Sequence, residues 1–397
     1  MLYGIAAAAS ALLLAALLAA LLRLPALRLG VVERRRQRRV PLSGGVAVVL
    51  ATCGVAGVGD WLGAAPLGDE IGALLAVAVA VAALGLIADV CRFKARLLVV
   101  GTAVAAAFVV PYGETGVVGG AAAVGWIVFV ALAFRSLDHA DGVAGTVGVV
   151  TAFGVAACAA AELLDGSAVL LSVLAAALTG FLMHNWPPAR VALGTCGSLF
   201  TGFLLAVTAV TTRAGHDPAV GTGVLFALTA VAVVDPLLVA LSRRAAGRSL
   251  LRAAPDHLAH RLRRLGLTAR GTALLLGAAA FCGVLVATLA HTGWAGPETV
   301  LWVAAGALVA VLALLRVPAY GLPAGRRPVR GSTRAPVSRL TLRRRATAPG
   351  RRRAPSAPVY APRRQPEAGN SPPGSGDRRA RLLESSQVSG FLRVRNG

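Results

Sequence analysis

Charged residues are scarce in this sequence: they make up 14% of its 397 residues, whereas a soluble domain carries about a quarter. Acidic residues are especially few, with 17 Asp and Glu against 40 Lys and Arg, and Lys94 is the only lysine. The length alone would allow two or three soluble domains. A hydrophobic fraction of 56% and a mean hydropathy of +0.72 exclude that class and indicate a membrane protein.

Cysteine is also sparse and carries no motif. The five cysteines are scattered without CxxC or HxxxH-type spacing, so neither a zinc site nor a disulfide framework is expected. The net charge of +23 would suggest nucleic acid as the partner of a soluble protein. Here most arginines lie between apolar runs or near the C-terminus, where membrane orientation explains them. We therefore predict no nucleic-acid partner.

Apolar runs long enough to cross a bilayer follow one another along the first 316 residues. The first run lacks the basic start and polar cleavage region of a signal peptide, so we expect a retained helix. The predicted spans cover about 2–22, 43–59, 70–88, 96–111, 117–134, 142–162, 167–184, 197–212, 219–241, 271–290 and 299–316. The sequence thus predicts an all-α, polytopic integral membrane protein with about eleven transmembrane helices.

The charges between these runs segregate as alternating connections would require. One set of connections holds Arg34–Arg39, Arg92, Lys94, Arg96, Arg135, Arg190, Arg243, Arg244 and the run from Arg248 to Arg270. The opposite set holds Asp60, Asp69, Glu70, Glu114, Glu162, Asp165, Asp217 and Glu298, with Arg213 as its one arginine. The positive-inside rule makes the first set cytoplasmic, with the N-terminus outside and the C-terminus inside.

The segment 317–397 differs in composition from the rest. It is rich in Pro, Arg, Gly and Ser and has few large apolar residues, so we predict a disordered basic cytoplasmic tail after a membrane-embedded domain at 1–316.

The most unusual polar stretch is RSLDHADGVAG at 135–145. Asp138 and Asp141 are three residues apart, so on a helix both carboxylates would share one face. Carboxylates at the rim of a membrane helix are costly to keep and therefore suggest a functional site. The alternative is that Arg135 merely neutralises Asp138 at a helix end.

Further polar segments fall on the same predicted cytoplasmic face: PLSGG at 41–45, Asp89 at the end of the third run, HNWPPAR at 184–190, GTCGS at 194–198 and HLAHRL at 257–262. Glycine-rich turns at a helix start can bind a phosphate through backbone N–H groups. Acids, histidines, arginines and glycine turns on one face fit an enzyme that acts on a phosphorylated solute and a lipid. The candidate substrate-binding residues are Lys94, Asn185, Arg190, Gly197, Ser198, His257, His260 and Arg261.

In this order, the motifs resemble those of the polyprenyl-phosphate N-acetylhexosamine-1-phosphate transferases. The resemblance runs from about Val40 to Leu267. It implies transfer of a sugar 1-phosphate from a UDP-sugar to polyprenyl phosphate in the cytoplasmic membrane, with release of UMP and with Mg²⁺ as cofactor. It also implies that Asp89, Asp138 and Asp141 are catalytic and that Asp89 and Asp141 hold the metal. A homodimer is a further hypothesis.

Several positions depart from the family pattern. Ala88, Ala144 and Thr195 replace family acids, Asp138 replaces an Asn, and Ala259 replaces the middle histidine of the His motif. Threonine offers only a neutral oxygen where Mg²⁺ prefers an anionic ligand, which weakens the expectation of Mg²⁺.

An arginine one turn before the aspartates suggests another way to balance their charge. We hypothesise that the Arg135 guanidinium pairs with Asp138 and Asp141 and takes the electrostatic place of the metal. The leading hypothesis is an active transferase, and the alternative is a catalytically inactive family member that acts as a scaffold or regulator. A transporter is disfavoured, because the centres of the spans hold almost no polar residues.

Overall fold

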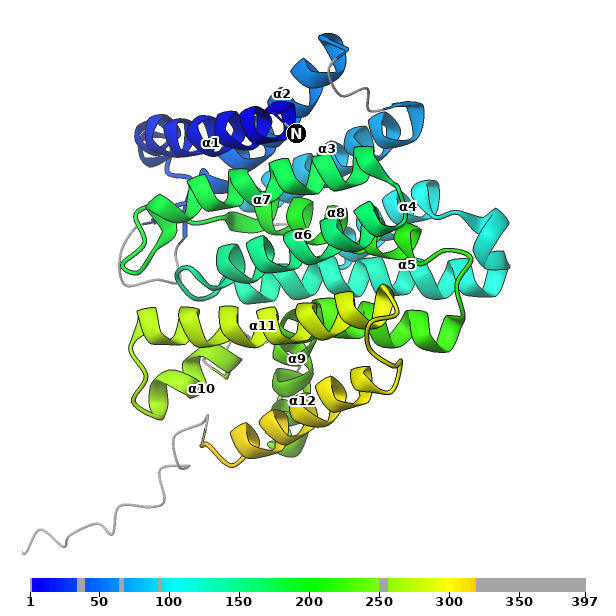
Figure 1. Cartoon of the computed structure of the whole chain (residues 1–397). Coiled ribbons are helices and arrows are strands. Elements are labelled where there is room, and N and C mark those ends of the chain that lie inside the picture. The colour runs from blue at the N-terminus through cyan, green and yellow to red at the C-terminus, as the bar shows by residue number, and fades with distance from the viewer. Residues whose placement is uncertain (1, 34–39, 64–67, 92–94, 250–255, 319–397) are drawn as a thin grey trace, which may run out of the picture. The chain divides into compact units, whose positions relative to one another are not determined.

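The computed structural model describes residues 2–33, 40–63, 68–91, 95–249 and 256–318. In this part the chain is helical, apart from one antiparallel pair of two-residue strands, β1 (Val32–Glu33) and β2 (Val40–Pro41). The helices are α1 (Leu2–Arg28), α2 (Gly44–Trp61), α3 (Gly68–Val90), α4 (Ala95–Val109), α5 (Tyr112–Leu137), α6 (Val143–Ala161), α7 (Asp165–Asn185), α8 (Gly194–Thr212), α9 (Pro218–Ala245), α10 (Leu258–Arg264), α11 (Ala269–His291) and α12 (Thr299–Leu315) (Figure 1).

Each of the eleven predicted runs forms a helix, which confirms the all-α polytopic fold. Nine described helices are long and apolar enough to cross a membrane, while α4 and α12 have 15 and 17 residues. Eleven spans and the orientation stay predictions. The helix α10 was not predicted, because its seven residues carry four charged or histidine side chains and no long apolar run. The prediction of a disordered tail concerns residues that, except for Val317 and Pro318, lie outside the described ranges.

The helix α8 is the centre of the packing. Nearly all its residues are buried, and it packs against α2, α3, α5 and α6. Small residues permit this close approach: a Cβ on Gly197 would lie 2.4 Å from the Cα of Gly45, and a Cβ on Gly85 would lie 2.7 Å from the Thr195 carbonyl oxygen. The contact at Gly85 brings the end of α3, with Asp89, to the beginning of α8.

The polar segments predicted for one face meet at one end of the bundle. Contacts there join the end of α3, the turn between α5 and α6, the loop between α7 and α8, and α10, whose His260 ring lies 4.9 Å from the His139 ring. At the opposite end, the Glu162 carboxylate lies 3.1 Å from His216 Nε2 and 3.2 Å from His291 Nε2. The Arg213 guanidinium lies 2.8 Å from His291 Nδ1. The two ends therefore match the two predicted sets of connections.

Candidate active site

Two carboxylates cap the first turn of α8. The Thr195 and Cys196 N–H groups donate to Asp89 Oδ1 and Oδ2, both at 3.1 Å, and the Gly194 N–H donates to Asp138 Oδ2 at 2.8 Å. Carboxylates are favourable there, because the N-terminus of a helix carries partial positive charge and unpaired N–H groups. In this structure these amides donate to Asp89 and Asp138, and the expectation that they bind a substrate phosphate stays a prediction.

The third carboxylate, Asp141, binds the loop between α7 and α8. Its Oδ2 accepts the Ala189 N–H at 3.0 Å. The buried Asn185 amide joins the same two segments, since it accepts the Gly142 N–H and donates to the Val191 carbonyl, both at 2.8 Å. Gly142 has φ 76°, a conformation that glycine adopts without steric cost. The aspartate turn and the 185–193 loop are thus held as one unit.

Arg135 lies beside this unit. Its Nε donates to Thr195 Oγ1 at 3.3 Å, and Thr195 itself follows Gly194 in the first turn of α8. The guanidinium therefore lies close to the position where the family pattern has an acid. The hypothesis that Arg135 takes the place of a metal by pairing with Asp138 and Asp141 stays a prediction.

The carboxylates fit an oxygen-binding cation. Asp89, Asp138 and Asp141 are all only half-buried, so a solute can reach them. Mg²⁺ prefers oxygen ligands and binds proteins through one or two carboxylates together with substrate phosphates, and carboxylates of this kind are what the three aspartates offer.

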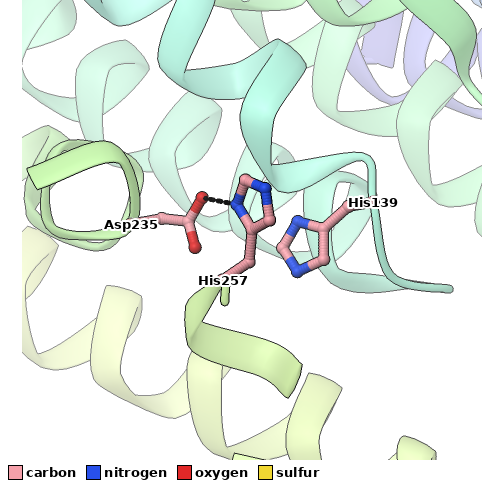
Figure 2. Close-up of side chains that lie close together, drawn as sticks. All are labelled: His139, Asp235 and His257. Carbon is pink, nitrogen blue, oxygen red and sulfur yellow. Dashed lines mark hydrogen bonds and ion pairs between the residues drawn. The ribbon is translucent and has the colours of Figure 1, made fainter. Parts of the chain in front are cut away.

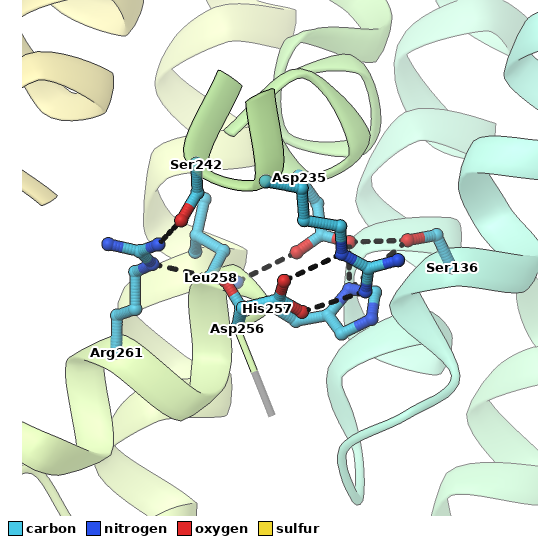
Figure 3. Close-up of polar contacts among 8 residues, drawn as sticks. Ser136, Asp235, Ser242, Asp256, His257, Leu258 and Arg261 are labelled. Atoms are coloured by element: carbon cyan, nitrogen blue, oxygen red, sulfur yellow. Dashed lines mark hydrogen bonds and ion pairs between the residues drawn. The ribbon is translucent and has the colours of Figure 1, made fainter. Parts of the chain in front are cut away.

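A histidine cluster lies beside these carboxylates, around the buried Asp235 of α9. The Asp235 carboxylate accepts the Ser136 hydroxyl at 2.5 Å, lies 3.0 Å from His257 Nδ1 and accepts the Leu258 N–H at 2.8 Å (Figures 2 and 3). The His139 ring stacks on His257, with ring centroids 4.3 Å apart, and it lies 4.9 Å from the His260 ring. Three imidazoles thus gather from the aspartate turn and α10.

Two buried arginines hold α10 in place. Arg243 donates from Nε and a terminal nitrogen to the two Asp256 oxygens, at 2.7 and 2.9 Å. Arg261 donates to the Ser242 hydroxyl and the Asp256 carbonyl, which links α10 to α9 (Figure 3). It also donates to the Leu314 and Val317 carbonyls at the end of α12. These contacts determine where His257 and His260 lie.

The predicted substrate-binding residues separate into two groups. Arg190 is exposed on the 185–193 loop, and His257 and His260 are partly accessible, so these three stay candidates. Three further residues make contacts within the chain, and their assignment to a substrate stays a prediction. Ser198 is fully buried and donates to the Gly194 carbonyl, Gly197 packs against α2, and Arg261 is 1% exposed with its donors bound to the chain. These three residues pack against neighbouring segments and hold the site's backbone in place. Lys94 lies outside the described residues.

Asp235 was missed by the sequence interpretation, which concentrated on the ends of the apolar runs. It lies inside the apolar helix α9, next to Pro236. A lone acid within a membrane helix was the available signal, because such residues are rare and usually functional.

Comparison with known proteins connects this site to enzymes. The family model for glycosyl transferase family 4 matches residues 71–213, which include all three half-buried aspartates and α8. A Streptomyces coelicolor protein named "Putative glycosyltransferase" is 60% identical over 410 residues, covering 100% of this chain and 99% of that protein.

Two further relatives have more detailed names. The decaprenyl-phosphate N-acetylglucosaminephosphotransferase of Mycobacterium tuberculosis is 30% identical over 300 residues, covering 64% of this chain and 74% of that protein. A Bacillus subtilis protein named "Probable undecaprenyl-phosphate N-acetylglucosaminyl 1-phosphate transferase" is 26% identical over 287 residues, covering 63% and 75%. The chain is therefore similar to relatives named for a polyprenyl phosphate and for N-acetylglucosamine.

Proposed function

Since the chain belongs to the polyprenyl-phosphate N-acetylhexosamine-1-phosphate transferase superfamily, we propose that it transfers a sugar 1-phosphate from a UDP-sugar to polyprenyl phosphate in a bacterial cytoplasmic membrane. The product would serve cell-envelope synthesis. UDP-GlcNAc is the first donor to test, because two relatives carry N-acetylglucosamine in their names. One observation carries the proposal: Asp89, Asp138 and Asp141 come together around residues 189–196 at one end of the bundle.

In the proposed reaction, an oxygen of polyprenyl phosphate attacks the β-phosphorus of the UDP-sugar. The bond from this phosphorus to the bridging oxygen breaks, and UMP leaves with the bonding electrons. Both reactants are anionic, so their approach needs positive charge. Mg²⁺ bound by Asp89 and Asp141 would neutralise part of the phosphate charge.

The chain itself supplies a positively charged side chain, Arg190, on a loop that is held in place beside the aspartates. The exposed Arg190 follows Ala189, whose N–H is bound by Asp141, so the loop that carries this guanidinium is held to the aspartate turn. A guanidinium can bind two phosphate oxygens at once. The partly accessible His260 offers a further nitrogen donor. Its pKa is lowered, mainly by burial and next by the charge of His257. We assign Arg190 to the diphosphate of the donor.

The proposal is tested by UMP release from UDP-GlcNAc by the purified full-length chain with undecaprenyl phosphate, with and without Mg²⁺. In the Asp141→Asn variant an oxygen remains for the Ala189 N–H but the charge is lost, so we expect turnover to fall at least about 100-fold with little loss of stability. Asp165→Asn, at an exposed acid that begins α7, is the matched control and should retain full activity.

If the wild type released no UMP from UDP-GlcNAc and none from UDP-MurNAc-pentapeptide, the proposed activity would be refuted and the inactive scaffold would be favoured. Equal turnover of Asp141→Asn and wild type would refute the assigned site.

A further inference from the structure

The histidine cluster beside the carboxylates has the geometry of a second metal site. His139, Asp235 and His257 each offer a ligand atom, and these atoms all lie within 4.8 Å of one another. Within the described ranges, no other group of three such side chains was found. The residues come from the turn after α5, from α9 and from the N-terminus of α10, which converge in Figure 2.

The hydrogen bonds leave a lone pair on each imidazole. His139 Nδ1 lies 2.6 Å from the Ser136 carbonyl oxygen, which can only accept, so Nδ1 carries the hydrogen and Nε2 carries the lone pair. His139 Nε2 is buried and has no hydrogen-bond partner within the described part of the chain. In the same way, His257 Nδ1 lies 3.0 Å from the Asp235 carboxylate, which leaves His257 Nε2 as an acceptor.

This is how metal-binding histidines are usually supported. One ring nitrogen donates to a carbonyl or carboxylate, which fixes the ring, and the other nitrogen binds the metal. Asp235 takes the supporting role at His257, and it is held in turn by Ser136 and the Leu258 N–H.

We propose that His139 and His257, each through Nε2, and His260 at the open side bind one zinc-like divalent cation, while Asp235 fixes the His257 ring through Nδ1. Imidazole nitrogens suit Zn²⁺ and its neighbours, whereas Mg²⁺ prefers oxygen ligands. The site is thus distinct from the Asp89, Asp138 and Asp141 carboxylates, and it stands whether or not the chain is a transferase. The alternative is a hydrogen-bonded histidine stack that binds no metal.

The test is calorimetric titration of Zn²⁺ into the full-length chain, purified without a histidine tag and stripped with EDTA. We expect one Zn²⁺ per chain, undisturbed by millimolar Mg²⁺. His139→Ala should weaken binding at least about 10-fold, since even a residue that only supports a ligand contributes about 10- to 100-fold. His184→Ala, at a histidine on the same face outside the cluster, should bind Zn²⁺ as the wild type does.

Two further measurements keep the test decisive. Co²⁺ bound to the unaltered chain should give the intense visible absorption of a low-symmetry nitrogen and oxygen site, so the result does not depend on the folding of a variant. His216→Ala removes a histidine of the Glu162 cluster at the opposite end. Absence of saturable Zn²⁺ binding, an unchanged affinity in His139→Ala, or loss of binding in His216→Ala instead would overturn the proposal.

Discussion

The capping of α8 by Asp89 gives a sharp test of the structure, because α9 provides a matched helix cap. Asp89 uses both oxygens, one for the Thr195 N–H and one for the Cys196 N–H. Asp217, at the N-terminus of α9, uses a single oxygen for both the Ala219 and Val220 N–H groups. Asparagine has only one side-chain oxygen, so Asp89→Asn must lose a hydrogen bond, whereas Asp217→Asn can retain both.

The expected loss of stability in Asp89→Asn follows from two contributions to the free energy of unfolding that this substitution removes. A hydrogen bond to a charged group contributes about 1.5–3 kcal/mol, and an anion at a helix N-terminus contributes about 0.3–1 kcal/mol more. Asp89 is half-buried against α8, so solvent screens it incompletely. We therefore expect Asp89→Asn to lower the free energy of unfolding by about 2–4 kcal/mol. Asp217→Asn should change it little, because asparagine caps helices as well as aspartate.

Equilibrium unfolding of the two variants by SDS in mixed detergent micelles, followed by circular dichroism, measures this difference. An Asp89→Asn variant as stable as the wild type would refute the described cap. Equal losses in both variants would refute the argument from the number of oxygens. The readout is stability, so it is independent of any role of Asp89 in turnover.

Two further pairs of variants test the packing by the same measurement. Arg243→Met or Asp256→Leu alone should cost about 3–5 kcal/mol, because each removes one side of a buried ion pair, and the double variant should recover most of this loss; additive losses would contradict the ion pair. Gly45→Ala should be strongly destabilising, since its Cβ would lie 2.3 Å from the Gly197 nitrogen. Gly57→Ala, in the same helix with open space, should stabilise by about 0.5–1 kcal/mol, and equal effects would refute the α2–α8 contact.

Hydropathy was enough to place the helices, because a bilayer forces apolar runs of a set length. The segregation of charges also predicted which loops meet: Asp89, Asp141 and His257 lie at one end of the bundle, and Glu162 and Arg213 lie at the other. The aspartates were found because acids are rare in this sequence.

Contacts between distant segments could not be predicted from local patterns. Asp89 and Thr195 are 106 residues apart, and they meet because small residues let α3 and α8 approach closely. For the same reason, motif residues such as Ser198 and Arg261 looked like ligand contacts, although the packing buries them. The sequence interpretation passed over Asp235 because it lies inside a helix and forms no motif with its neighbours.

The central claim, transfer of a sugar 1-phosphate, is tested most directly by following the β-phosphate of the donor. The full-length chain would be incubated with undecaprenyl phosphate and UDP-GlcNAc labelled at the β-phosphorus, and the lipid would be extracted; UDP-MurNAc-pentapeptide with the same label would follow. We predict label in the lipid fraction, unlabelled UMP in the aqueous fraction, and loss of both in Asp141→Asn. Label that leaves in UDP would show transfer of the sugar alone and contradict the account, as would the absence of transfer from both donors.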